Sequence, residues 1–331
     1  MIYRKKILLL SALALLLALI YAGTFFLDSG LREEMRSKYS WIKPQMLELA
    51  DRIEIAGMSG PVILERKKNI WVMPLYTEEG GRGISRDFPV KQPRVNDLFK
   101  ALSRRANYPL RSVIASGQDR LGLGEGQASR IIIRGGAGLP LLDLQIGFGG
   151  AFGSTIYLRK TGSGEARSGE DIFSIFTETG RNVWYDLSLF ENIPPDMVQR
   201  VLVNAPGNTG SYSISRSGRT WSFSFLNTSA ADFSFTIDRF AAESWIRFIT
   251  TLEADDFDYF LKKDDPVFNM GSIILELGDG TFRTLSAGFS DVTEGEDKKY
   301  PVTASGKEFA YSLNSRAVSG LFRDASYFTT F

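Results

Sequence analysis

The chain has 331 residues, with 39 Lys and Arg against 38 Asp and Glu and 44% hydrophobic residues, values that fit a globular protein of two domains. It contains no cysteine and no histidine. Disulfides, thiolate metal sites, thiol nucleophiles and every catalytic triad that uses an imidazole are therefore excluded. The formal net charge of +1 offers no electrostatic footprint for nucleic acid.

The N-terminus has the pattern of a signal anchor. Arg4, Lys5 and Lys6 precede residues 7–27, which are uncharged and mostly Leu, Ala and Ile. At about 1.5 Å per residue in a helix, this stretch matches a bilayer hydrocarbon core of roughly 30 Å. A cleaved signal peptide is the alternative, but no small-x-small cleavage site follows the apolar run. We therefore expect residues 1–27 to form a cytoplasmic tail and an uncleaved transmembrane helix, with the body of the chain outside the cytoplasm.

The region after this anchor divides into a stalk and two repeats. Residues 28–50 are charged and mixed, which indicates a juxtamembrane stalk. The first repeat spans residues 51–193 and the second spans residues 194–331, with a Pro-Pro pair at the start of the second. Ordered features recur in the same sequence in both, which indicates an internal duplication.

Each repeat begins with a β-hairpin that ends in a tryptophan. An apolar alternation runs into a polar turn, at residues 67–69 in the first repeat and 217–219 in the second. The matched positions, at a constant offset, are residues 53–55, Gly60, Leu64, Arg66 and Trp71 in the first repeat and Val203, Gly210, Ile214, Arg216 and Trp221 in the second.

An amphipathic helix is predicted next in each repeat, because apolar residues recur three and four positions apart. Pro93 occupies a position that tolerates proline at the start of a helix, and Asp238 is a candidate N-cap. The residues that define this part are Phe88, Val90, Val95, Leu98 and Leu102 in the first repeat and Phe235, Ile237, Trp245 and Ile249 in the second.

A second hairpin, another strand, a short helix and a closing motif complete each repeat. Hairpins in place of βαβ units predict an α+β fold, in which a transmembrane helix precedes two tandem repeats of an antiparallel, hairpin-rich sheet with one packed helix each. The hairpins are residues 131–133 and 273–275, turning at 135–138 and 278–280 and returning to Gly147-Phe148 and Gly288-Phe289; the strands are 155–160 and 300–304; the closing motifs are 184–190 and 322–328.

Two glycine-rich stretches, residues 122–126 and 147–153, fall short of nucleotide-binding patterns. Gln127 and Phe152 stand where those patterns need glycine, and neither stretch leads from a strand directly into a long helix. Ordinary loop glycine is the better interpretation, and no nucleotide or other cofactor is expected.

An acidic cluster in the second repeat has two interpretations. It lacks the alternating ligands and central glycine of a calcium loop, so we expect no metal site. A carboxylate-dependent hydrolase centred on Asp255 and Asp258 is the functional interpretation. A solvated face is favoured over it, and the interleaved aromatic residues suit a partly buried helix end. The cluster comprises Glu253, Asp255, Asp256, Asp258, Asp264 and Asp265.

Other residues that resemble functional groups have structural interpretations. Trp71, Trp184, Trp221 and Trp245 could stack on sugars, but matching large apolar residues in the other repeat favour the core. Residues 305–307 are interpreted as a turn in place of a Ser-Lys pair. The recurring Asp-x-Ser at residues 186–188 and 324–326 is explained by a carboxylate that caps the following turn.

Several elements together resemble the bacterial family named domain of unknown function 4340. They are the N-terminal anchor, the hairpin from Leu64 to Trp71, the helix at residues 95–102, and the segments 156–158 and 186–190. The most specific are Leu121-Gly122-Leu123 and Leu144-Gln145-Ile146-Gly147, and the similarity covers roughly residues 51–331 as two copies. The second copy lacks a clear Gly-Leu element before Ser272.

The resemblance implies a partner, because genes of this family often lie beside those of ABC transporter components of the gliding-motility type. We therefore expect a non-enzymatic accessory or interaction protein of an ABC-type complex, anchored by one helix in the bacterial inner membrane with its body in the periplasm. No catalytic, cofactor or metal residues follow from the resemblance. A cell-wall or polysaccharide-binding module with exposed aromatics is the alternative, and a carboxylate-dependent hydrolase is a more distant one.

Overall fold

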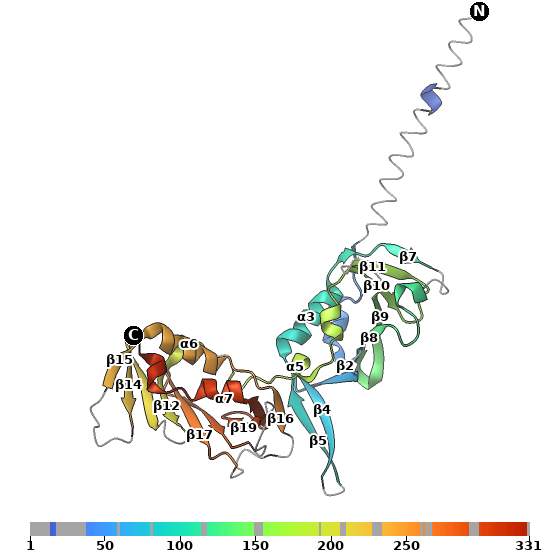
Figure 1. Cartoon of the computed structure of the whole chain (residues 1–331). Helices are drawn as coiled ribbons and strands as arrows, with labels where there is room; N and C mark the ends of the chain where they lie inside the picture. The colour runs from blue at the N-terminus through green and yellow to red at the C-terminus, as the bar shows by residue number, and fades with distance from the viewer. Residues whose placement is uncertain are drawn as a thin grey trace, which may run out of the picture. The chain divides into compact units, whose positions relative to one another are not determined.

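The computed structural model describes two compact units, formed by Met1–Tyr185 and Asp186–Phe331 (Figure 1). The described residues are 14–17, 38–57, 60–79, 82–113, 118–148, 155–191, 193–205, 210–226, 234–258, 261, 267–290 and 298–329. Of the expected transmembrane segment, residues 7–27, the description covers only 14–17, which are helical, and the rest lies outside the described residues. Within the described part of the chain, no helix has the length and apolar character needed to cross a membrane.

Unit 1, residues 1–185, contains a nine-stranded antiparallel sheet. Its strand order is β5-β4-β3-β2-β8-β9-β10-β11-β7, so the two hairpin-rich halves join through the pairing of β2 with β8. The strands are β2 (Ala50–Gly57), β3 (Gly60–Lys67), β4 (Ile70–Glu79), β5 (Arg82–Pro89), β7 (Leu110–Ser112), β8 (Ser129–Gly135), β9 (Leu139–Phe148), β10 (Thr155–Lys160) and β11 (Ala166–Glu170).

Unit 2, residues 186–331, repeats this architecture strand for strand. Its order is β15-β14-β13-β12-β17-β18-β19-β20-β16, which confirms the predicted duplication and the α+β class and shows that each repeat has its own sheet. The strands are β12 (Val198–Asn204), β13 (Ser211–Ser217), β14 (Thr220–Phe225), β15 (Ser234–Ile237), β16 (Asp256–Asp258), β17 (Gly271–Leu277), β18 (Phe282–Ala287), β19 (Lys299–Ala304) and β20 (Ala310–Asn314).

One longer helix packs on each sheet, as predicted. Helix α3 (Gln92–Ser103) contacts β4, and α6 (Arg239–Thr250) contacts β14. Pro93 lies in the first turn of α3, and the Asp238 carboxylate accepts a hydrogen bond from Ala241 N at 2.6 Å, so the predicted N-cap is confirmed. The helices cover one face of each sheet with fully buried side chains, namely Val95, Leu98 and Leu102 in α3 and Ala242, Trp245 and Ile249 in α6.

The first hairpins of the two units superimpose in register with one correction. Arg66 pairs with Trp71 in unit 1 as Arg216 pairs with Trp221 in unit 2, as expected. However, Ile53 pairs with Leu64 as Val201 pairs with Ile214, so Ile53 corresponds to Val201 and not to Val203. The constant offset fails there because the loop between β12 and β13 is longer than the loop between β2 and β3.

The closing motifs also need a corrected register. Lys91 N donates to Trp184 O at 3.0 Å, and Asp238 N donates to Phe328 O at 3.0 Å, each at the N-cap of the long helix. Trp184 therefore corresponds to Phe328 and not to Phe322. The residues after Tyr185, which were assigned to the first repeat up to residue 193, bond within unit 2, where Leu189 N donates to Leu252 O at 3.1 Å.

The expected stalk is partly folded onto unit 1. Strand β1 (Lys38–Tyr39) pairs with β6 (Ala106–Asn107), and Trp41 N donates to Leu102 O at 3.1 Å at the end of α3. The Tyr39, Trp41 and Tyr108 rings then pack edge to face. The shorter helices are α2 (Pro44–Glu48), α4 (Ser174–Thr177), α5 (Arg181–Trp184), α7 (Ser315–Leu321) and the 3-10 turns η2 (Asp119–Leu121), η3 (Gly136–Gly138), η4 (Pro195–Met197) and η6 (Ala325–Phe328).

Two matched glycines allow the backbone to cross closely over the sheets. A Cβ at Gly147 would lie 2.2 Å from Leu121 O, and a Cβ at Gly288 would lie 2.3 Å from Val267 O. Gly147 belongs to one of the two segments that carry the family resemblance, and Leu121 belongs to the other. These two segments therefore pack against each other.

Candidate functional site

The hairpin of β4 and β5 leaves the sheet of unit 1 and continues as a two-stranded arm. Strand β4 pairs with β3 only up to Val72, and from Met73 to Glu79 it pairs with β5 alone (Figure 1). We call residues 73–88 the arm. Two-stranded ribbons have little stability of their own in water, because they bury little apolar surface.

Pro74 explains why the arm separates from β3. The turn at Lys68 and Asn69 has positive φ at both residues, so Lys67 and Ile70 form the hydrogen-bonded pair that closes it. Hydrogen-bonded pairs alternate along an antiparallel ladder, and the next two would be Glu65 with Val72 and Ile63 with residue 74. Proline has no N–H to donate, so the ladder ends at Val72.

Unit 2 has serine at the matching position, and its described residues form no arm. Ser224 pairs with Ser213, and the ladder continues until Leu226 N donates to Ser211 O at 2.8 Å. The two units therefore differ in whether their fourth strand stays attached to the third. Proline at position 74 and serine at position 224 give this difference a physical reason, since only serine can donate to the third strand.

An ion pair holds the base of the arm. Beyond it, the two strands of the arm pair with no third strand in the described part of the chain. Lys67 Nζ lies 2.7 Å from Asp87 Oδ1, and this hydrogen bond holds the pKa of Lys67 above its ordinary value. Further out, the Tyr76 side chain is 79% exposed. Exposed strand edges bind extended segments of other proteins by adding a strand through main-chain hydrogen bonds.

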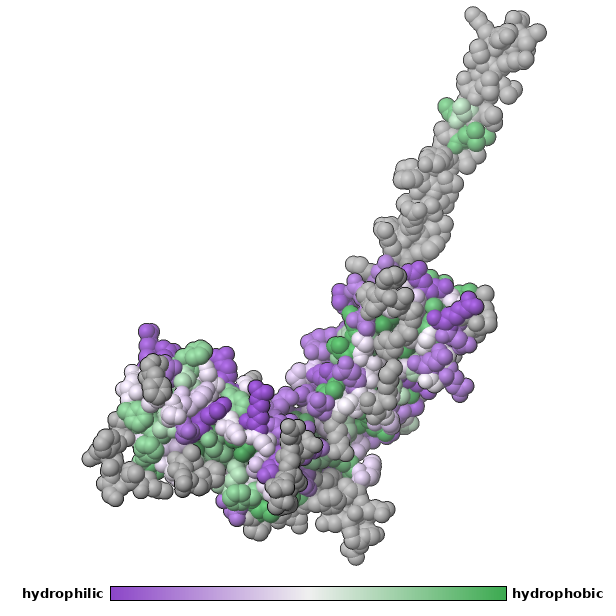
Figure 2. Space-filling model, viewed as in Figure 1, coloured by the Kyte–Doolittle hydropathy of each residue, from purple (hydrophilic) through white to green (hydrophobic). Residues whose placement is uncertain are grey.

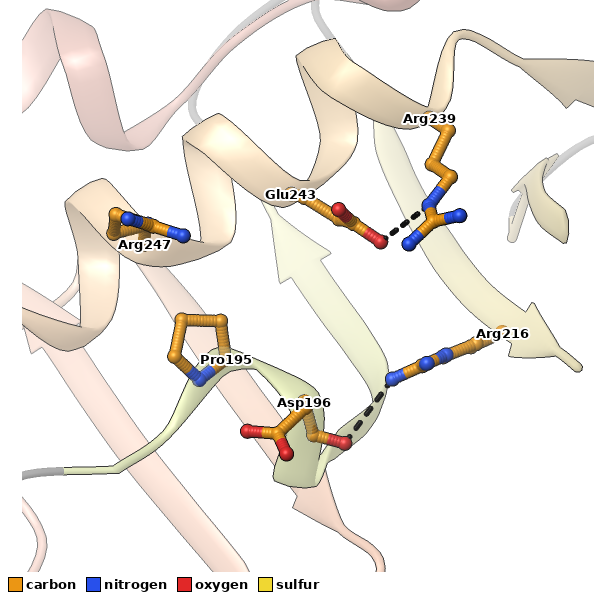
Figure 3. Close-up of a pocket in the computed structure, with 6 residues that line it drawn as sticks. All are labelled: Pro195, Asp196, Arg216, Arg239, Glu243 and Arg247. Atoms are coloured by element: carbon orange, nitrogen blue, oxygen red, sulfur yellow. Dashed lines mark hydrogen bonds and ion pairs between the residues drawn. The ribbon is translucent and has the colours of Figure 1, made fainter. Parts of the chain in front are cut away.

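A second candidate is an arginine-lined pocket of about 300 Å³ in unit 2 (Figure 3). Arg239 Nε donates to Glu243 Oε1 at 2.7 Å along one face of α6. Arg216 crosses from β13 and donates to Asp196 O at 3.1 Å. Arg247 lines the pocket from the next turn of α6 and forms no ion pair with the described residues.

The electrostatics of this pocket favour anions. The hydrogen bond from Arg239 is the main reason that the pKa of Glu243 lies below its ordinary value, and the buried Trp221 Nε1 and the charge of Arg216 act in the same direction. Trp221 Nε1 itself has no hydrogen bond of ordinary geometry. Guanidinium groups arranged in this way can donate to a carboxylate or a phosphate.

Part of the pocket is structural, since unit 1 repeats it. Arg66 Nη2 donates to Glu48 O at 2.8 Å, as Arg216 donates to Asp196 O. In each unit the arginine that pairs with the hairpin tryptophan thus donates a hydrogen bond to the main chain of the segment that precedes the first strand.

Two described carboxylates of the acidic cluster, Asp255 and Asp258, accept hydrogen bonds from neighbouring residues. The Asp255 carboxylate accepts hydrogen bonds from Asn314 N at 2.7 Å and from Asn314 Nδ2 at 3.1 Å, and Asp258 Oδ1 accepts from Leu261 N at 3.1 Å. The expected helix end is wrong, because residues 256–258 form the edge strand β16. Asp264 and Asp265 lie outside the described residues. No group of carboxylates in the described part could hold a metal ion.

The four tryptophans considered as sugar platforms are all buried. Trp71, Trp184, Trp221 and Trp245 each expose 5% or less of their surface, and Trp245 Nε1 donates to Gly320 O at 3.0 Å. Their assignment to the core is confirmed, and none of the four can stack on a polysaccharide without unfolding its unit.

The two Asp-x-Ser motifs and residues 305–307 have the structural roles that were expected. Asp324 Oδ1 accepts from Ser326 Oγ at 2.5 Å and caps η6, and Asp186 Oδ1 accepts from Ser188 N at 3.2 Å. Residues 305–307 form a turn in which Lys307 N donates to Ala304 O at 3.2 Å. Gly122, at the start of the loop at residues 122–126, lies close to Gly147 of β9, while residues 149–153 lie outside the described residues.

Sequence reasoning missed both the arm and the arginine pocket. The signal for the arm was present in the repeat alignment as proline in one copy and serine in the other. The pocket had a weaker signal, since Arg239, Glu243 and Arg247 recur every four residues on a predicted helix. The chain matches no family model and no curated protein.

Proposed function

We propose that the chain is a non-enzymatic interaction protein, anchored by one N-terminal helix in the bacterial inner membrane, with its body in the periplasm as an accessory of an ABC-type transport complex. The observation that carries the interaction role is the arm of unit 1. The membrane and transporter parts rest on the uncharged stretch at residues 7–27 and on the family resemblance.

The arm supports protein binding because the described residues of unit 2 form the same sheet without an arm. The ladder of unit 2 shows that the sheet needs no arm to be complete. In unit 1 the loss of ladder hydrogen bonds beyond Val72 lowers stability by about 1 kcal/mol for each bond. An element that weakens the sheet and presents open strand edges is suited to a partner strand that completes its hydrogen bonds.

The described part of the N-terminal segment is compatible with an anchor. Leu15, Leu16 and Leu17 are helical and exposed, as leucines facing lipid would be. Within the two units, the carboxylates first considered for hydrolysis serve as caps and turn partners, and the tryptophans serve as core. Polysaccharide binding would therefore have to use other aromatics, such as the exposed Phe240, and no observation favours it.

Site-specific crosslinking in native membranes tests the proposal. A photoreactive amino acid replaces Tyr76 in the full-length chain, and the matched control replaces Leu226, the exposed residue at the corresponding position of unit 2. We expect adducts with subunits of an ABC-type transporter from position 76 and none from position 226. Equal labelling from both positions, or no transporter subunit among the adducts, would remove the proposed role of the arm.

A further inference from the structure

An edge of unit 1 next to β1 combines cationic and apolar side chains. We call it the β7 edge and define it by Arg104, Arg105, Leu110, Arg111 and Val113. Leu110 is 47% exposed and Val113 is 61% exposed, and all three arginines are exposed. In Figure 2 hydrophilic residues with apolar ones between them cover the end of unit 1 where Figure 1 labels β7 and β11.

The β7 edge is continuous with the point where the chain enters unit 1. Strand β1 pairs with β6, and β6 follows Arg104 and Arg105 directly. The Tyr39 ring of β1 lies beneath the Arg167 guanidinium of β11, 4.6 Å from its centroid. Strand β11 pairs in turn with β7, so the start of the folded chain and the β7 edge form one surface.

The cations of this surface, Arg104, Arg105, Arg111 and Arg167, outnumber the acids beside them, Glu165, Glu170 and Asp171. Glu165 forms an ion pair with Arg167 at 2.8 Å, and Asp171 Oδ1 accepts a hydrogen bond from Ser174 N at 2.9 Å. Arg111 Nε donates to the neutral Ser168 Oγ at 2.8 Å, and Arg111 lines a pocket with Glu170 and Asp171. Arg104 and Arg105 form no ion pair with the described residues.

The geometry points to the β7 edge as a surface that docks on anionic phospholipid headgroups of the membrane in which the same chain is anchored. This inference rests on the proposed anchor. Ten residues, 28–37, separate the proposed span from Lys38. Ten residues reach at most about 36 Å when fully extended, so this end of unit 1 stays close to the bilayer surface.

Both components of the edge fit that occupant. Each Lys or Arg near an anionic leaflet contributes about 1 kcal/mol, which is about fivefold in the docking equilibrium. Exposed Leu and Val side chains between cations can enter the headgroup region, which buries their apolar surface.

The absence of cysteine permits a direct test with the full-length chain. Val113→Cys is labelled with an environment-sensitive fluorophore. The control Ile70→Cys carries the label at a similarly exposed site in β4, near the opposite edge of the sheet. Each protein is reconstituted in vesicles of phosphatidylcholine, with or without phosphatidylglycerol. We expect a blue shift and quenching by lipid-attached quenchers at position 113 only, in the anionic vesicles only, and reversed by salt.

Charge reversal provides the second part of the test. Arg104→Glu with Arg105→Glu should lower the docked-to-undocked ratio at least about 25-fold, while Arg219→Glu in unit 2 should leave it unchanged. If the emission and quenching of the label at position 113 do not depend on lipid composition, while the chain stays with the vesicles at alkaline pH, this inference alone is overturned. A chain that washes off at alkaline pH would overturn the proposed anchor and the inference together.

Discussion

Replacing Pro74 with Ser should close the arm of unit 1 onto β3. The variant gives residue 74 the N–H that Ser224 has in unit 2, so residue 74 and Ile63 can exchange two main-chain hydrogen bonds. At about 1 kcal/mol net for each bond, the gain is about 2 kcal/mol, less about 0.4–1 kcal/mol for the lost rigidity of proline in the unfolded chain.

Amide hydrogen exchange is the direct assay. Exchange at Ile63 N–H should slow by about tenfold in Pro74→Ser, since an opening free energy of about 1.4 kcal/mol corresponds to tenfold protection. The reciprocal variant Ser224→Pro should leave Ser213 O without its donor and cost about 1–3 kcal/mol in urea unfolding of unit 2. Unchanged exchange at Ile63 in Pro74→Ser would show that the proline does not end the ladder.

Three further predictions concern stability. Asp238→Ala removes the N-cap of α6 and should cost about 1 kcal/mol in urea unfolding, and an unchanged midpoint would contradict the capping role. Gly147→Ala should cost about 3 kcal/mol, because the added Cβ meets Leu121 O, whereas a neutral result would mean that the crossing chain can move aside. Burial alone would raise the pKa of Asp143, but hydrogen bonds from Arg130 and Thr161 hold the pKa below its ordinary value. The stabilisation is present above the unfolded pKa and is lost as the pH falls through the folded one, so from neutral pH to about pH 3 Asp143→Asn should lose less stability than the wild type.

The sequence was informative where structure is local. The hairpin from Leu64 to Trp71, the helix with Leu98 and the cap at Asp238 depend on alternation, helical spacing and a short polar side chain, and all are confirmed. These patterns act over a few residues, so they can be recognised without knowing the rest of the fold.

Elements that depend on pairing between distant residues could not be predicted from the sequence. The edge strands β7 and β16 have three residues each and no pattern of their own, because they form only by adding to β11 and β20. The closing motifs were aligned by an Asp-x-Ser that caps turns at two unrelated positions, both within unit 2, whereas the true match is Trp184 with Phe328. Local capping chemistry recurs often and therefore does not identify equivalent residues.

The pairing of β2 with β8 sets the order in which the chain can fold. Arg134 and Glu54, which form an ion pair between β8 and β2, are 80 residues apart. Strand β2 therefore cannot pair with β8 until the second half of unit 1 has been synthesised. Tyr185 bridges to Val90 and ends unit 1, and unit 2 begins with the next residue. A chain that emerges from its N-terminus can therefore complete one sheet before the next is made, which disfavours pairing of strands between the two similar sheets.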